Sequence, residues 1–79
     1  MNALERIQRL LAKYAKVEFV SPEQSIFDGG LDMSSIAFTE FVLEVEEEFE
    51  TDIDPDLLDQ SIKTVGQLTE RLVSIVVQP

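Results

Sequence analysis

The sequence predicts a small all-α fold, a four-helix bundle made of three main helices and one short helix. Three segments carry apolar residues spaced three and four apart, which is the period of one helical face. Each of these segments follows an asparagine, serine or threonine, residue types that cap the first turn of a helix. With 79 residues and no cysteine, the chain is expected to form one domain, residues 1–79, without disulfides to support its core.

The first helix is predicted from Asn2 to about Lys16. Asn2 is placed to cap its start, and Glu5 follows three residues later. Lys13 and Lys16 suit the negative end of the helix dipole. The apolar face consists of Leu4, Ile7, Leu10, Leu11 and Tyr14. We interpret this segment as a helix that packs on the core.

A long connection, residues 17–33, follows the first helix. The segment 21–24, Ser-Pro-Glu-Gln, has a serine cap, a proline in the first turn and a glutamine three residues after the cap. This pattern predicts about one helical turn. Gly29-Gly30 predicts a turn that needs a positive φ. The apolar residues expected to pack onto the core and hold the loop are Ile26, Phe27 and Leu31.

The second main helix, from Ser34 or Ser35 to about Phe49, is predicted to have one apolar and one acidic face. The apolar face consists of Phe38, Phe41, Val42, Val45 and Phe49, and the acidic face of Glu40, Glu44, Glu47 and Glu48. Glutamates four residues apart destabilise a helix by about 0.2–0.5 kcal/mol per pair. Because these like charges destabilise the helix that carries them, and because the acidic face contains no lysine, we expect this face to bind a partner. The stretch Asp28–Phe49 is therefore the candidate functional region.

Two further helices are predicted after this region. The short helix has Asp54 as its cap and Pro55 at its first position, and it extends to Asp59. The last helix begins at a capping box, Thr64-Val65-Gly66-Gln67. Gly66 weakens its first turn, and we expect it to allow close approach of a neighbouring helix. The apolar face consists of Val65, Leu68, Leu72, Ile75 and Val76.

The charge of the chain is concentrated in its middle. Residues 17–62 contain fourteen of the sixteen acidic residues and none of the six basic ones, a formal charge of −14 against +4 for the two ends. Such a surface repels nucleic acid and anionic membranes and steers the protein toward basic protein partners. The sequence shows no secretory signal and no apolar run long enough to span a membrane, so a cytoplasmic protein is expected.

The composition gives little indication of catalysis or of metal binding. The chain has no histidine and no cysteine, and no nucleophile–base pair is evident, so an enzyme is not expected. The segment 52–56, Asp-Ile-Asp-Pro-Asp, resembles the start of a calcium loop. Leu57 and Lys63 stand where such a loop requires glycine and glutamate, so we expect no metal site.

The segment Gly30–Phe49 resembles the phosphopantetheine-attachment region of acyl and peptidyl carrier proteins. Ser34-Ser35-Ile36 stands where the family commonly has Asp-Ser-Leu, and Glu46-Glu47-Glu48-Phe49 matches the acidic end of the family's helix. The modified serine of the family lies fourteen residues before that phenylalanine, which corresponds to Ser35 in this sequence. Ser34 is the alternative, although its spacing differs by one residue.

This resemblance implies a carrier-protein bundle and a covalent cofactor. A phosphopantetheinyl transferase would attach 4′-phosphopantetheine from coenzyme A to the Ser35 hydroxyl, and the thiol of this arm would carry an acyl or aminoacyl group. If Ser34 caps the helix, Ser35 lies in the first turn with its hydroxyl exposed. Enzymes that load and unload the arm would dock basic residues against Glu40, Leu43, Glu44 and Glu47. A monomer is expected, and the interior between the last three helices could shelter a chain.

The sequence departs from the fatty-acid carriers of this family at two positions. Ser34 replaces their aspartate, and Ala37 replaces the acid that commonly follows the serine and its apolar neighbour. We therefore expect a specialised, discrete carrier. The alternative interpretation is an unmodified acidic helical module that binds a basic protein partner through the same face. Neither the cargo nor the pathway can be named from the sequence.

Overall fold

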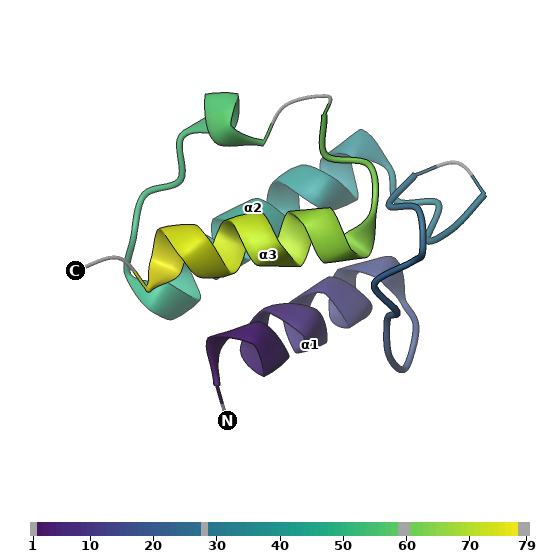
Figure 1. Cartoon of the computed structure of the whole chain (residues 1–79), viewed down its shortest axis with the longest axis horizontal. Helices are drawn as coiled ribbons and strands as arrows, with labels where there is room; N and C mark the ends of the chain where they lie inside the picture. The colour runs from purple at the N-terminus through teal and green to yellow at the C-terminus, as the bar shows by residue number, and fades with distance from the viewer. Residues whose placement is uncertain (1, 28, 59–60, 78–79) are drawn as a thin grey trace.

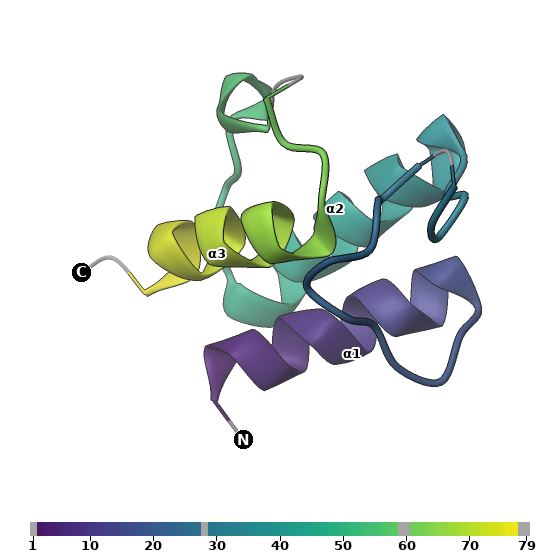
Figure 2. The ribbon, with the colours of Figure 1, turned by 45° about the vertical axis from the view of Figure 1, so that its right-hand side comes forward.

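The computed structural model describes residues 2–27, 29–58 and 61–77, which form three α-helices and one 3₁₀ helix. These elements are α1 (Ala3–Ala15), α2 (Ser35–Phe49), η1 (Pro55–Leu57) and α3 (Val65–Val76). The α-helices lie side by side, with α2 and α3 running opposite to α1 (Figure 1). Figure 2 shows η1 on the connection that arches from α2 to α3. The predicted all-α class is confirmed.

Each α-helix begins at the cap that the sequence predicts. The Asn2 side chain accepts a hydrogen bond from the N–H three residues on at 2.9 Å, and the Ser34 hydroxyl accepts one from the Ala37 N–H at 3.0 Å. The capping box is complete, because the Thr64 hydroxyl accepts from the Gln67 N–H at 3.2 Å while the Gln67 side chain accepts from the Thr64 N–H at 3.1 Å. Local side-chain chemistry therefore sets all three helix starts.

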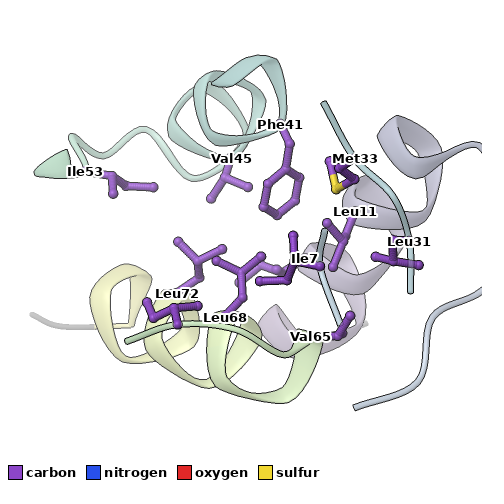
Figure 3. Close-up of a cluster of buried hydrophobic side chains, with 12 residues drawn as sticks. Ile7, Leu11, Leu31, Met33, Phe41, Val45, Ile53, Val65, Leu68 and Leu72 are labelled. Carbon is purple, nitrogen blue, oxygen red and sulfur yellow. The ribbon is translucent and has the colours of Figure 1, made fainter. Parts of the chain in front are cut away.

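The core forms where the apolar faces of the α-helices meet (Figure 3). Phe41 and Val45 point from α2 toward side chains of α1 and α3. The largest side chains with no exposed area are Phe41, Ile7, Leu11, Ile26, Leu68, Leu72, Val45 and Val65. Burial of an aliphatic or aromatic side chain of this size stabilises a fold by about 1.5–3 kcal/mol. None of the helices in the described ranges is long and apolar enough to cross a membrane.

Two of the predicted apolar residues are partly exposed at the edge of the core. Leu4 and Phe27 each leave 40% of their surface exposed. Phe27 stacks on Phe38 of α2, with ring centroids 5.5 Å apart, so it contacts the fold from outside. Its neighbours Ile26 and Leu31 are buried as predicted.

The predicted turn after α1 is a single hydrogen-bonded turn rather than a helix. The Gln24 N–H donates to the Ser21 carbonyl at 3.1 Å, and the Ser21 N–H donates to the Gln24 side chain at 2.7 Å. This turn packs on Gly66, whose N–H donates to the Pro22 carbonyl at 2.9 Å. A Cβ at Gly66 would lie 3.2 Å from the Pro22 Cβ. The expectation that Gly66 faces a neighbouring helix was wrong, because its neighbour is this turn.

Where the sequence predicts a short helix from Asp54 to Asp59, the described residues contain only the three-residue 3₁₀ helix η1. The Leu57 N–H donates to the Asp54 carbonyl at 3.0 Å, and the Asp54 side chain accepts from the N–H two residues on at 2.9 Å. Arg71 of α3 donates to the Leu57 carbonyl at 2.8 Å and so connects η1 to α3. The predicted end of this helix, Asp59, and the first residue of the candidate region, Asp28, lie outside the described residues.

The two glycines of the connection have different structural roles. Gly29 has a φ of 78°, the positive value that the sequence predicts, and its N–H donates to the Asp32 side chain at 3.3 Å. Gly30 does not have a positive φ. A Cβ at Gly30 would collide with the carbonyl of Ser25 and would lie 2.7 Å from the Ser25 nitrogen. Gly30 is therefore required because the loop packs directly on its own backbone.

This difference predicts the relative stability of two alanine variants. Gly29→Ala should lower the free energy of unfolding by about 1–2 kcal/mol, the cost of a left-handed conformation. Gly30→Ala should cost about 3 kcal/mol, the upper part of the range for overpacking, because backbone atoms cannot rotate out of the way. Urea unfolding followed by circular dichroism measures both values. An equal or larger loss in Gly29→Ala would contradict the packing role of Gly30.

Candidate functional site

The two serines at the start of α2 have different environments. Ser34 is the N-cap, with extended backbone angles and its hydroxyl engaged with the Ala37 N–H. Ser35 is the first residue of α2; both serines are exposed, but only the Ser34 hydroxyl caps the helix. The Thr39 hydroxyl donates to the Ser35 carbonyl at 2.9 Å. Ser34 therefore has a structural role, and the Ser35 hydroxyl is accessible from solution.

Backbone amides at the start of α2 face outward beside Ser35. The first four N–H groups of a helix have no partner within the helix. Here the Ala37 N–H donates to the Ser34 hydroxyl, and the Phe38 N–H makes the first intrahelical bond, to the Ser34 carbonyl at 2.9 Å. The amides of Ser35 and Ile36 remain available at the positive end of the helix dipole. The first turn of α2 contains no acidic residue, so no negative charge in that turn would repel a bound anion.

The loop before α2 holds Ser34 in place through both its side chains and its backbone. Leu31 and Met33 are 8% and 7% exposed and pack in the core. The N–H of Leu31 donates to the Ser25 carbonyl at 2.9 Å, and that of Met33 donates to the Ile26 carbonyl at 3.2 Å. This anchoring fixes the position at which α2 starts.

Two basic residues of α1 contact the acidic side chains on one edge of α2. Lys13 approaches Glu44 at 3.4 Å, and Arg6 contacts Glu48 at 2.8 Å. The Arg6 guanidinium also lies 4.3 Å from the centre of the Phe49 ring. The acidic face contains no basic residue of its own, and its basic neighbours come from another helix.

The edge of α2 that faces away from α1 is free. It consists of alternating apolar and acidic side chains, which we call the exposed stripe: Ile36, Glu40, Leu43 and Glu47. Ile36 and Leu43 leave 73% and 54% of their surface exposed. Their spacing of four, three and four residues places all four side chains on one helical face. This apolar component gives the stripe a contact surface in addition to its charge.

The predicted partner-binding set is only partly brought together by the fold. Glu40, Leu43 and Glu47 lie in the exposed stripe, whereas Glu44 is half-buried and paired with Lys13. Glu44 therefore differs from the other three residues of the set in having a basic partner on α1. Ile36 is not in the predicted set, although its helical spacing to Glu40 and Leu43 is visible in the sequence.

A shallow pocket continues the exposed stripe at the end of α2. Its volume is about 390 Å³, and it is lined by Leu43, Glu46, Glu47, Glu50, Thr51 and Asp52. One of these acids is already engaged, because the Glu46 side chain accepts from the Ile53 N–H at 2.7 Å. Within the described residues, no group of three or more acidic side chains is arranged to hold a metal ion.

Comparison with known proteins identifies one family. A family model described as "phosphopantetheine attachment site" matches residues 5–72, a range that includes α2, the loop before it and most of α1 and α3. No curated protein and no solved structure matches the chain. The match includes both serines and the exposed stripe.

The different roles of the two serines can be tested by stability. Ser34→Ala should lower the free energy of unfolding by about 1 kcal/mol, because an N-cap hydrogen bond is lost. Ser35→Ala should change it by less than about 0.5 kcal/mol, as is usual for an exposed position. Urea titration of both variants against the original chain provides the comparison. A larger loss in Ser35→Ala would mean that the cap is assigned to the wrong serine.

Proposed function

The chain belongs to the phosphopantetheine-attachment family, and on this basis we propose that it is a discrete, specialised acyl carrier with its arm on Ser35. As a member of this family it carries acyl groups on a 4′-phosphopantetheine arm joined to a serine, and it is not itself a catalyst. The arm supplies the thiol, absent from this cysteine-free chain, on which a cargo is held as a thioester.

The observation that carries this proposal is the exposed Ser35 hydroxyl beside a serine that is already used as a cap. A transferase must bring the hydroxyl of its substrate against the phosphate of coenzyme A, so that hydroxyl has to be accessible. Ser35 meets this requirement, whereas the Ser34 hydroxyl holds the first turn of α2. The spacing from Ser35 to Phe49 supports the same choice.

The first turn of α2 fits the phosphodiester that this modification creates. The serine oxygen displaces the nucleotide part of coenzyme A from the phosphate, and the hydroxyl loses its proton. The resulting phosphate carries a negative charge next to the free amides of Ser35 and Ile36, where the helix dipole favours an anion. The neutral cap, Ser34, adds no repulsion.

We propose that partner enzymes dock on the exposed stripe. These partners are a phosphopantetheinyl transferase and the enzymes that load an acyl or aminoacyl group and transfer it onward. The two apolar residues of the stripe, Ile36 and Leu43, offer contact area, and Glu40 and Glu47 attract basic residues of the partner. Glu44 is left out of this surface because it is half-buried and pairs with Lys13. We further propose that residues 1–79 form one domain that acts as a cytoplasmic monomer.

Modification of Ser35 is the direct test of the carrier proposal. The chain, incubated with a phosphopantetheinyl transferase and coenzyme A, should gain the mass of one phosphopantetheine group. Ser35→Ala should gain nothing, and Ser34→Ala should still be modified because the attachment oxygen is intact. Intact-mass spectrometry reports all three results. No gain in the original chain would favour the unmodified interaction module, and a gain in Ser35→Ala that is lost in Ser34→Ala would move the site to Ser34.

The docking surface can be tested with two variants of equal net charge. Glu40→Gln/Glu47→Gln removes two charges from the exposed stripe, and Glu44→Gln/Glu48→Gln removes two from the edge facing α1. The first variant should be modified more slowly, with a weaker dependence on salt, because surface charges act mainly on the association rate. The second should be modified at nearly the original rate.

The measurement is the initial rate of modification at low and high ionic strength, with circular dichroism as the control for folding. Equal slowing in both double variants would show that the transferase responds to net charge alone. Slowing only in Glu44→Gln/Glu48→Gln would assign docking to the other edge of α2.

A further inference from the structure

Three phenylalanine rings form a continuous column from the surface into the core. Phe27, in the loop, stacks on Phe38 with ring centroids 5.5 Å apart and planes inclined by 30°. Phe38 meets Phe41 edge to face, with centroids 6.3 Å apart. Exposure decreases along this aromatic column, from 40% for Phe27 to a partly buried Phe38 and a fully buried Phe41.

The aromatic column begins next to the proposed attachment point. Ser35 and Phe38 are three residues apart on α2, so their side chains are neighbours on the helix surface. Phe27 covers Phe38 from the loop side. A chain that leaves Ser35 and turns along α2 toward the interior therefore meets these two rings first.

Behind these rings the interior is filled by other side chains. Phe41 points from α2 into the centre of the bundle (Figure 3). Val45 on the next turn, and Leu68 and Leu72 of α3, have no exposed area. A long alkyl group could enter here only by separating stacked rings and then displacing Phe41, and packed cores resist both changes.

We propose that the aromatic column excludes long apolar cargo from the interior, so that this carrier holds a short or polar acyl group, such as an aminoacyl group, outside the fold. This inference rests on the proposed carrier function and names the class of its cargo. It replaces the expectation that the interior shelters a chain. A long alkyl group held outside the fold keeps its apolar surface in water, which is unfavourable. A short or charged acyl group exposes little apolar surface and can remain in water.

The test compares cargo of increasing length on the same arm. A transferase and acetyl-, hexanoyl- or decanoyl-coenzyme A load the chain, and intact mass confirms each product. For the original chain, the melting temperature should not rise with acyl length, because no apolar surface of the cargo becomes buried. Hydroxylamine should cleave all three thioesters at equal rates, because each thioester is exposed to solvent.

Two variants on the same helix distinguish the aromatic column from the rest of the core. Phe38→Ala opens space beside Ser35, so its melting temperature should rise with acyl length and its decanoyl thioester should be cleaved more slowly. Phe49→Ala makes the same change at the other end of α2 and should behave like the original chain. If Phe38→Ala does not fold, Phe27→Ala removes the more exposed ring of the column and should show the same length dependence.

Stabilisation of the original chain by decanoyl cargo, together with slowed cleavage, would overturn the proposal. It would also be overturned if Phe38→Ala and Phe27→Ala, once folded and loaded, showed no dependence on acyl length. A failure of the proposed carrier function can be distinguished from a failure of this inference, because the original chain would then gain no mass at the loading step.

Discussion

The site depends on backbone hydrogen bonds between the long connection and the start of α3. The Ile26 N–H donates to the Lys63 carbonyl at 3.0 Å, and the Val65 N–H donates to the Gln24 carbonyl at 2.9 Å. These two bonds flank an isolated antiparallel bridge and bring a loop far from α3 in sequence into the core. Because Ile26 is then fully buried, it anchors the connection to the core ahead of Ser34. In a chain this small the core is thin, so a loop held by both backbone and side chains is an economical way to fix a functional residue.

The packing of α1 on α2 determines which charges of the acidic helix are available. Taken alone, α2 is a self-repelling helix, with glutamates four residues apart along one side. In the fold, Lys13 and Arg6 of α1 compensate Glu44 and Glu48. Each exposed ion pair contributes only about 0.2–1 kcal/mol, so its main consequence is geometric. One edge of α2 has basic partners from α1, and the other keeps its charge and two exposed apolar side chains. The docking surface that we propose depends on this asymmetry.

The features that the sequence predicted correctly are those set within a few residues. The caps at Asn2, Ser34 and Thr64 depend on hydrogen bonds to amides three residues away, and the helix faces depend on spacing alone. The predictions that failed concern contacts between distant segments. Nothing near Glu44 in the sequence shows that a lysine thirty-one residues earlier lies beside it, and nothing near Gly66 shows that a turn, not a helix, packs on it.

The neutral side chain of the serine that caps α2 keeps negative charge away from the place where we propose that the phosphate lies. Carrier proteins commonly have an aspartate before the modified serine, and an aspartate caps a helix as well as a serine does. Ser34 provides the same hydrogen bond without a charge, and Ala37 likewise adds none, so the first turn is neutral. The nearest acid further along α2 is Glu40, five residues beyond Ser35. The positive end of the helix dipole is thus available to the phosphate of an arm on Ser35, the attachment point we propose, and the acidic residues of the proposed docking surface begin a full turn away. These two proposed functions of α2 are separated along its axis.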